Sequence, residues 1–490
     1  MESVKLFING EWITSKTTET TPVYNPSDGI QIAATPMCGA DDVGAAIQAA
    51  ARAFPGWAKT PVVDRARIMF RLVSLMERDF EALSQLVTRE HGKTLDEARG
   101  EVRRGIEVAE FACGAPNLMM GDSLENIARD IDCDTIRQPL GVSVAITPFN
   151  FPFMVPMWTL PIALVCGNTY VLKPSERVPL SAVRIAELLT EAGLPPGVFN
   201  LVHGGKTAVD TLLTHPDVKT VSFVGSTPVA KYIYETGTKN GKRVQSAGGA
   251  KNYMVVLPDA DIDSTVAAVM GSAYGCAGER CMAGSILVCA EGAGERILDP
   301  LSHAAKNFRV GPTDRDPNVQ MGPVVTPQHL ARLHQRIEDG LKEGAQLRVD
   351  GRGVQVEKTP NGFYLGPTIF DNVTPTMSIA REEIFGPVLS TMHTDNFNEA
   401  IAWCNNSEYG NAAVLFTSSG GAARKFRHEI NAGMVGINIG VPAPMAFFPF
   451  SGWNNSFFGD LHVQGSEGIS FFTRQKVTIS RWLETRRQFF

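Results

Sequence analysis

The sequence predicts an α/β protein with two large domains and a small additional sheet. The chain has 490 residues, well above the size at which a single hydrophobic core stops growing. Between residues 142 and 224, β-rich runs alternate with helical segments, the pattern that is typical of parallel βαβ units. These runs lie at 142–146, 169–172, 198–202 and 220–224. A second α/β stretch begins at 253–257 and continues past Ala432.

The predicted domains follow from where these patterns change. We expect residues 1–123 and 141–248 to form a nucleotide-binding domain of the Rossmann type, and residues 249–445 to form a second α/β domain. The segments 124–140 and 446–490 carry strand-like runs with nothing of their own to pack against. Because unpaired strand edges need partners, we expect these two segments to form a small projecting sheet that bridges to another subunit.

The N-terminal part is predicted to contain a hairpin followed by helices. Residues 6–12 form the hairpin, because Asn9-Gly10 supplies the positive φ angles of a two-residue turn. Asp41 is predicted to cap a helix that stops at Pro55. The two longer helical patterns that follow cover about 63–90 and 94–119.

Composition excludes several classes of function. Apolar residues make up 44% and charged residues 20%, and the net charge of −6 gives no basic footprint for nucleic acid. We find no signal-peptide pattern and no apolar run of about 20 residues that would span a bilayer. The eight cysteines include no Cys-x-x-Cys pair, and the nine histidines form no cluster. We therefore expect a cytoplasmic protein without metal, membrane or nucleic-acid partners.

The stretch 275–283 surrounds Cys281 with small residues and places Arg280 beside it. A thiol becomes a working nucleophile when its thiolate fraction rises, and we expect Arg280 to lower the pKa of Cys281. For an isolated cysteine, a buried structural thiol is the ordinary alternative. Here the pattern predicts a catalytic nucleophile.

The Glu-Arg-Cys-Met-Ala block at 279–283 resembles the nucleophile motif of the aldehyde dehydrogenases, and further blocks repeat the resemblance in family order along nearly the whole chain. The resemblance implies an aldehyde dehydrogenase-like fold, with an NAD domain, a catalytic domain at 249–445 and a small bridging sheet. It also implies an oxidoreductase that assembles as a homotetramer, a dimer of dimers.

The sequence lacks the Gly-x-Gly-x-x-Gly fingerprint, but Gly225-Ser226 ends a predicted strand and opens a helix whose free N–H groups suit a phosphate. The block 172–177 resembles the family's ribose clamp, which implies that Lys173 and Glu176 hydrogen-bond to ribose hydroxyls. A carboxylate there repels a 2′-phosphate, so NAD is favoured over NADP. The residues expected to contact the cofactor are Thr147, Phe149, Lys173, Glu176, Arg177, Gly225, Ser226, Gly248, Glu383 and Phe385.

Two further blocks carry roles that the resemblance implies. In the block that starts at Thr147, Asn150 donates a hydrogen bond to the oxyanion, and Thr147 and Phe149 line the nicotinamide pocket. The ordinary alternative for Asn150 is a turn residue before a helix. In the second block, Glu383 holds the nicotinamide ribose and Phe385 packs beside it.

The chain departs from most aldehyde dehydrogenases upstream of the nucleophile. Alignment on Lys251 places Ala247 where a Glu usually activates water, and residues 245–252 contain no Asp or Glu. Water needs such a base, whereas a thiol with a pKa near 8.5 is already partly ionised at neutral pH. Transfer of the acyl group to a thiol is therefore favoured. This agrees with a narrower resemblance, to the CoA-acylating methylmalonate-semialdehyde dehydrogenases, in the blocks 148–152, 241–245, 249–252 and 464–473.

A semialdehyde acid needs a receptor for its carboxylate. By resemblance, Arg104 and Arg280 serve this role, and the planar fork of an Arg pairs well with a carboxylate. A solvated helix face with Glu partners is an equal alternative for Arg104. Three positions differ from the resembled group, namely Tyr253 for His, Glu279 for Gln and Phe458 for Arg.

The expected reaction is NAD-dependent oxidative decarboxylation of malonate semialdehyde or methylmalonate semialdehyde, with CoA as the acyl acceptor and acetyl-CoA or propionyl-CoA as the product. Two alternatives stay open. One is a hydrolytic aldehyde or semialdehyde dehydrogenase that releases a free acid. The other is a non-catalytic protein on the same fold, because fold does not imply function.

Overall fold

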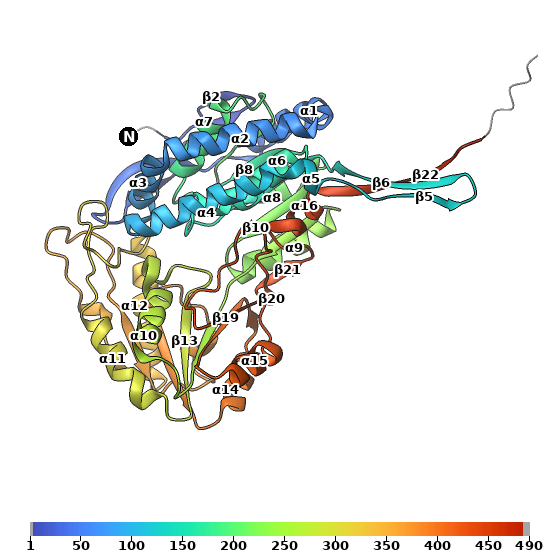
Figure 1. The fold of residues 1–490 in the computed structure, drawn as a ribbon. Coiled ribbons are helices and arrows are strands. Elements are labelled where there is room, and N and C mark those ends of the chain that lie inside the picture. Colours follow the sequence, from blue (N-terminus) through green and yellow to red (C-terminus); the bar gives the residue numbers. More distant parts are fainter. Residues whose placement is uncertain (1–2, 484–490) are drawn as a thin grey trace, which may run out of the picture.

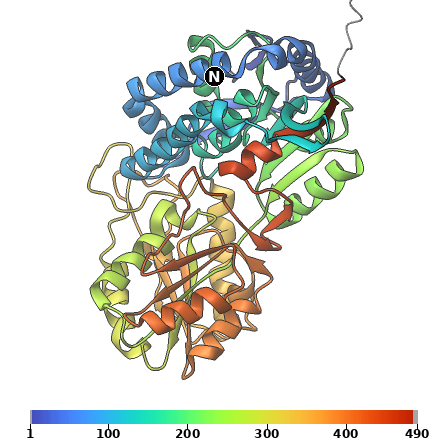
Figure 2. The same ribbon diagram turned by 45° about the vertical axis from the view of Figure 1, so that its right-hand side comes forward.

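The computed structural model describes residues 3–483 and shows two lobes with a projecting arm (Figures 1 and 2). The upper lobe in these views is built on an eight-stranded sheet, and the lower lobe on a seven-stranded sheet. Helices accompany both sheets, so the predicted α/β architecture is confirmed.

The eight-stranded sheet has the order β2-β1-β9-β8-β7-β10-β11-β21. These strands are β1 (Leu6–Ile8), β2 (Glu11–Ile13), β7 (Val142–Ile146), β8 (Thr169–Lys173), β9 (Phe199–Leu201), β10 (Val218–Val224), β11 (Arg243–Ala247) and β21 (Phe457–Gly459). The β1–β2 hairpin turns at Asn9 and Gly10, with φ angles of 55° and 84°, as predicted. Strands β9, β8, β7, β10 and β11 are mutually parallel, so their carboxyl ends share one edge of the sheet.

Helices cover both faces of this sheet. One face packs against α1 (Ala40–Lys59), α8 (Lys206–Thr214) and α9 (Thr227–Lys239). The other packs against α2 (Val62–Arg78), α3 (Phe80–His91), α4 (Leu95–Cys113), α5 (Ala115–Leu118), α6 (Met154–Val165) and α7 (Leu180–Glu191). Successive side chains of a strand point to opposite faces, so Val144 joins the first core and Ala145 joins the second.

Several helix predictions need correction. The pattern at 94–119 is two helices, α4 and α5, which are separated at Gly114 (φ −77°, ψ 1°). Gly39 is at the cap position of α1, and the predicted cap residue Asp41 lies in its first turn.

The pattern at 63–90 is two helices, because the backbone leaves the helical region at Asp79 (φ −99°, ψ 13°). Helix α1 begins at Ala40 and continues through Pro55, which was predicted to stop it. The buried Trp57 explains the continuation, since its indole N–H donates to the Leu164 carbonyl over 3.0 Å and packing outweighs the local preference.

The seven-stranded sheet has the order β14-β15-β16-β13-β12-β18-β19. Its strands are β12 (Asn252–Val256), β13 (Gly284–Ala290), β14 (Gln346–Val349), β15 (Thr368–Asp371), β16 (Val388–Thr394), β18 (Ala412–Phe416) and β19 (Met434–Ile437). The helices of this lobe are α10 (Ile262–Tyr274), α11 (Gly294–Lys306), α12 (Pro327–Lys342), α13 (Ser378–Arg381), α14 (Phe397–Asn405) and α15 (Gly420–Glu429). A separate hydrophobic core fills this lobe.

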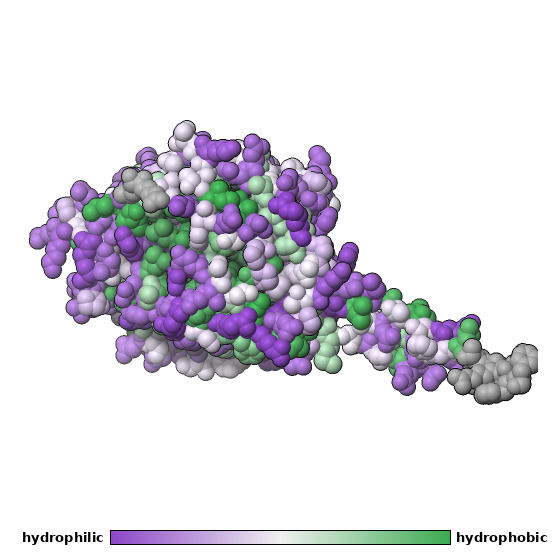
Figure 3. Space-filling model, turned by 90° about the horizontal axis from the view of Figure 1, so that it is seen from above, coloured by the Kyte–Doolittle hydropathy of each residue, from purple (hydrophilic) through white to green (hydrophobic). Residues whose placement is uncertain are grey.

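The arm is a three-stranded antiparallel sheet of β5 (Ser123–Ala128), β6 (Ile131–Pro139) and β22 (Thr473–Arg481). Figure 3 shows apolar side chains along it, and the exposed ones are Leu124, Ile127, Ile136, Val477 and Ile479. Residues 457–471 of the C-terminal segment do not join the arm, because β21 pairs with β11 and α16 (Gly465–Phe471) packs on α6. Two short strand pairs are β3 (Thr20–Asn25) with β4 (Ile30–Pro36) and β17 (Tyr409–Gly410) with β20 (Trp453–Asn454).

Within residues 3–483, no helix combines the length and the apolar character needed to cross a membrane. The same part of the chain contains no group of three or more His, Cys, Asp or Glu side chains arranged to hold a metal ion. The eight cysteines are all free thiols.

Candidate active site

A cavity of about 890 Å³ opens where the parallel strands of the upper sheet end. Strand β7 leads to Thr147, β8 to Lys173, β10 to Gly225 and β11 to Gly248, and each of these residues lines the cavity. The chain runs outward from β7 to β8 and β9, then returns to β10 on the other side, so the cavity lies at the switch point of an open sheet. Every residue predicted to contact the cofactor lines this one cavity.

The predicted ribose clamp lies on the wall of this cavity. The Lys173 ammonium is 3.5 Å from the Glu176 carboxylate, and burial lowers the pKa of Lys173. A hydrogen bond of 2.7 Å from the Thr35 hydroxyl to the Glu176 carbonyl fixes the backbone here. At the other end, α9 begins after Ser226 and points its free N–H groups toward the cavity. The arrangement suits a ribose next to a pyrophosphate.

An aromatic cluster surrounds Phe149 at the inner end of the cavity. The Phe385 and His329 rings lie edge-on to it at 5.8 and 6.3 Å, and His91 stacks on it at 6.4 Å. The Arg177 guanidinium lies 5.3 Å from the centre of the same ring. Phe149, Phe385, His329 and Arg177 all line the cavity, so a flat heterocycle would meet a rigid wall here. Sequence reasoning missed the two histidines.

The segment that carries Cys281 makes a sharp turn between α10 and β13. Cys276, Ala277 and Gly278 have φ angles of 49°, 53° and 72°, a left-handed run that non-glycine residues rarely adopt. A Cβ at Gly278 would lie 2.2 Å from the Gly386 carbonyl oxygen, so only glycine fits there. We call residues 276–283 the nucleophile loop.

Two asparagines distant in sequence hold this loop in place, Asn252 on β12 and Asn411 directly before β18. The side-chain amides of Asn252 and Asn411 each donate to the Cys281 carbonyl over 2.9 Å. Asn252 also donates to the Ala283 carbonyl over 2.9 Å. Asn252 lies in one of the sequence blocks that carry the family resemblance, but the sequence predicted no role for it. No sequence pattern pointed to Asn411. These contacts fix where the Cys281 thiol points.

Arg280 lowers the pKa of Cys281, as predicted, but its effect is too small to make the thiol acidic. Burial raises the pKa of Cys281 to about 12, and the Glu383 carboxylate raises it further, while Arg280 opposes them only weakly. The Arg280 guanidinium instead donates to the Cys276 sulfur over 3.2 Å and pairs with Glu97 at 3.1 Å. The thiol therefore needs a base. Glu383 lines the same cavity, and burial raises its pKa to about 7.

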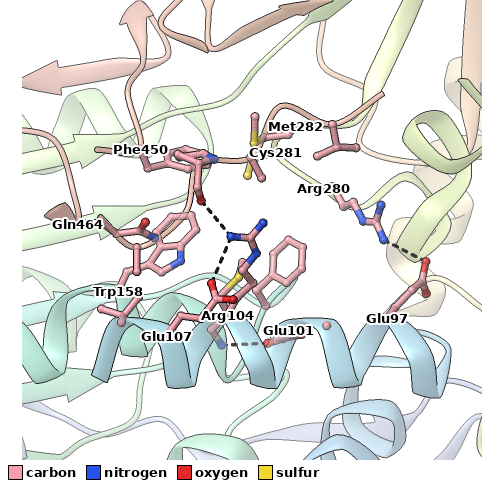
Figure 4. Close-up of a pocket in the computed structure, with 18 residues that line it drawn as sticks. Glu97, Glu101, Arg104, Glu107, Trp158, Arg280, Cys281, Met282, Phe450 and Gln464 are labelled. Atoms are coloured by element: carbon pink, nitrogen blue, oxygen red, sulfur yellow. Dashed lines mark hydrogen bonds and ion pairs between the residues drawn. The ribbon is translucent and has the colours of Figure 1, made fainter. Parts of the chain in front are cut away.

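A second cavity, of about 270 Å³, reaches Cys281 from the side of α4 (Figure 4). Its lining is mostly apolar, and its polar residues are Glu97, Glu101, Arg104, Glu107, Arg280 and Gln464. Arg104 points from α4 into the space below Cys281, where it contacts the Glu107 carboxylate at 3.2 Å and the Pro444 carbonyl at 3.4 Å. Both interpretations of Arg104 thus have a basis, since it has a Glu partner and also faces the cavity. Cys281 is the one lining residue that this cavity shares with the larger one, among the residues described.

The three departures from the resembled group lie outside both cavities. Tyr253 is buried in β12, and Phe458 in β21 packs 6.3 Å from the Tyr234 ring. Glu279 belongs to the nucleophile loop, and its side chain is fully buried. Ala247 is buried at the end of β11. Tyr253, Phe458 and Ala247 therefore act through packing, whereas Glu279 also places a buried carboxyl group close to two histidines.

Glu279 makes the stability of the protein depend on pH. It lies 3.5 Å from His329 and 3.9 Å from His91, and burial raises its pKa from 4.5 to about 8. Between these values the native state keeps a proton that the unfolded chain releases, so stability falls as pH rises, by about 1.4 kcal/mol per unit at most. Replacing Glu279 with Gln is expected to raise the melting temperature increasingly between about pH 5 and pH 8.

Thermal unfolding across this pH range checks the prediction. Replacing Glu110, an exposed carboxylate on α4, with Gln is the matched control and is expected to leave the pH dependence unchanged. A melting-temperature difference for Glu279→Gln that stays constant with pH would contradict the buried, protonated carboxyl.

The fold and the two cavities that meet at one partly buried thiol define an aldehyde dehydrogenase. The model of the aldehyde dehydrogenase family matches residues 12–478. The chain therefore belongs to the aldehyde dehydrogenase family, and the predicted family and fold are confirmed.

The chain is similar to proteins of one kind within this family. It is 52% identical over 481 residues to a malonate-semialdehyde dehydrogenase of Halalkalibacterium halodurans, covering 98% of this chain and 99% of the relative. It is 51% identical over 479 residues to malonate-semialdehyde dehydrogenase 1 of Geobacillus kaustophilus, with 98% of each chain covered.

Solved structures of named methylmalonate-semialdehyde dehydrogenases are also similar to this chain. A structure described as a methylmalonate-semialdehyde dehydrogenase of Sinorhizobium meliloti in complex with NAD has a TM-score of 0.98 at 44% identity and covers 100% of this chain and 99% of its own. The methylmalonate-semialdehyde dehydrogenase of Oceanimonas doudoroffii has a TM-score of 0.97 at 45% identity, with 99% of both chains covered. The similarity therefore extends over the whole chain in sequence and in structure.

Proposed function

We propose that this chain oxidises malonate semialdehyde or methylmalonate semialdehyde with NAD and transfers the acyl group to CoA. The observation that carries the proposal is the placement of Cys281 between a nucleotide-sized cavity and a small cavity that contains Arg104. The names of the relatives and the NAD bound to the Sinorhizobium meliloti structure support it.

Oxidation begins when the Cys281 sulfur attacks the aldehyde carbon and its proton passes to a base, for which Glu383 lies in the same cavity. The oxyanion that forms takes hydrogen bonds from the Asn150 side chain and the Cys281 backbone N–H. The residues that line the larger cavity would hold NAD, which would supply the hydride acceptor for this carbon. Cys281 then holds the acyl group as a thioester.

The substrate carboxylate pairs with Arg104, and Arg280 adds positive charge beside the nucleophile. The thioester carries this carboxylate at its β position, so the carbon–carbon bond can break, releasing CO2 and leaving an enolate that takes a proton from solvent. The CoA thiolate then attacks the thioester carbon, and the Cys281 sulfur leaves. The products are acetyl-CoA or propionyl-CoA.

The absence of a carboxylate from residues 245–252 is the reason for choosing CoA over water. NADH formation from malonate semialdehyde, measured with and without CoA, tests this choice. We expect sustained turnover only with CoA, with acetyl-CoA identified by mass spectrometry. Equal turnover without CoA, giving a free acid, would show that another group activates water, and the hydrolytic alternative would replace the proposal.

We further propose that the arm pairs with another subunit and that the enzyme is a homotetramer, a dimer of dimers. The exposed apolar side chains on the arm support this, because contact with another subunit would remove them from water and pair the free strand edges. The eight free cysteines support a cytoplasmic location.

A further inference from the structure

We propose that Lys93 and Glu101 are positioning residues that set the geometry of the oxyanion site. They form an ion pair of 2.6 Å, and both side chains are fully buried. Neither residue had a role in the sequence analysis, and neither is part of the reaction described above. The inference rests on the proposed function, because it takes Asn150 as the oxyanion donor.

The contacts of this ion pair converge on the turn at residues 150–154. The Lys93 ammonium donates to the Asn150 carbonyl over 2.7 Å and lies 4.0 Å from the centre of the Phe151 ring. The Glu101 carboxylate accepts from the backbone N–H groups of Phe153 at 2.8 Å and Met154 at 3.1 Å. The ion pair therefore holds the turn at both of its ends.

The turn depends on this ion pair because its own side chains do not cap the start of α6. Helix α6 begins at Met154, and Phe153 at the cap position of this helix offers no side-chain acceptor. The first backbone N–H groups of α6 therefore rely on the Glu101 carboxylate. Asn150 is fixed through its carbonyl, while its side chain faces the larger cavity. Catalytic hydrogen bonds are sensitive to position, and a displacement of about 1 Å can lower a rate 10²-fold.

The position of the pair connects both cavities. Glu101 lies on α4 below the smaller cavity, which it lines together with Phe151 and Met154 (Figure 4). Asn150 lines the larger cavity on the other side of the turn. One buried ion pair thus holds the turn that contributes residues to both cavities.

The test removes both charges together, because removal of one partner alone would leave an unpaired buried charge and destabilise the fold. The variants are Lys93→Met/Glu101→Gln, Asn150→Ala, and the triple replacement. We expect the double variant to lower kcat by roughly 30-fold or more, with the Kd for NAD nearly unchanged. We also expect the triple variant to be no slower than Asn150→Ala, because the pair acts through Asn150.

The matched control is Arg99→Met/Glu81→Gln, which removes an exposed ion pair of 2.8 Å that also involves α4. It is expected to keep the parent kcat. If the double variant does not fold, Glu101→Asp retains both charges but shortens the reach to α6, and we expect it to lower kcat while leaving NAD binding intact.

Three results would overturn the inference. They are parent-like kcat in the folded double variant, parent-like kcat in Glu101→Asp, and a triple variant whose loss is the product of the separate losses. If Asn150→Ala itself retains the parent kcat, the oxyanion role in the proposed function fails as well. The two failures are therefore distinguishable in one experiment.

Discussion

Replacing Cys281 with Ala is expected to abolish NADH formation while NAD still binds. In the proposed reaction the thiol is the nucleophile that forms the hemithioacetal, and without it no carbon is presented for hydride transfer. The change removes one sulfur atom from the boundary of the two cavities and leaves the ribose clamp and the aromatic cluster intact. NADH absorbance measures turnover, and protein fluorescence quenching measures the Kd for NAD.

Cys404 provides the control for this experiment. Like Cys281, it is a free thiol, and its side chain is buried on α14. Among the residues that the structure describes, it is not one of those that line either cavity. Cys404→Ala is expected to keep the parent kcat. Measurable turnover by Cys281→Ala would rule out the covalent route through this residue.

Replacing Asn150 with Ala is expected to lower kcat by about 10²–10³-fold, which corresponds to roughly 2.7–4 kcal/mol of lost transition-state stabilisation. The Asn150 amide offers a preorganised donor to the charge that develops on the aldehyde oxygen, and it is 3% exposed, so water replaces it poorly. The KM for NAD is expected to change little, because Asn150 contributes to the transition state more than to cofactor binding.

Steady-state kinetics at saturating NAD check this second prediction. Asn150→Asp is the companion variant, because it keeps the shape but places a negative charge next to the oxyanion. It is expected to be at least as slow as Asn150→Ala. A fall in kcat of less than about 3-fold in both variants would contradict the oxyanion role, since one such donor is usually worth far more.

Local patterns predicted the strands and the residues at their ends. Strands β7, β8, β9 and β10 carried a clear β-rich signal, with Lys173 at the end of β8 and with Thr147 and Gly225 directly after β7 and β10. Strand β11, which leads to Gly248, was not among the predicted strands. Because parallel strands end at one edge, the sequence position of each residue was enough to place it on the cavity. The resemblance to a family then supplied the roles that position alone did not.

The parts that sequence missed depend on contacts between distant residues. Asn411 is 130 positions from Cys281, and Lys93 is 57 positions from Asn150. The raised pKa of Cys281 comes mainly from burial, which no neighbouring residue in the sequence reveals. Helix α1 likewise continues beyond Pro55 because Trp57 contacts Leu164, which is more than 100 positions away in the sequence. Local propensity has no access to such contacts.

The position of Cys281 on two cavities has a stereochemical consequence. In the proposed hemithioacetal, the sulfur, the departing hydrogen, the oxygen and the carbon chain occupy four different directions. The hydrogen must face the larger cavity, the chain must enter the smaller one, and the oxygen must face Asn150. Only one mirror-image form satisfies all three requirements. The protein thus imposes a single handedness on a carbon that is flat before the reaction and flat again afterwards.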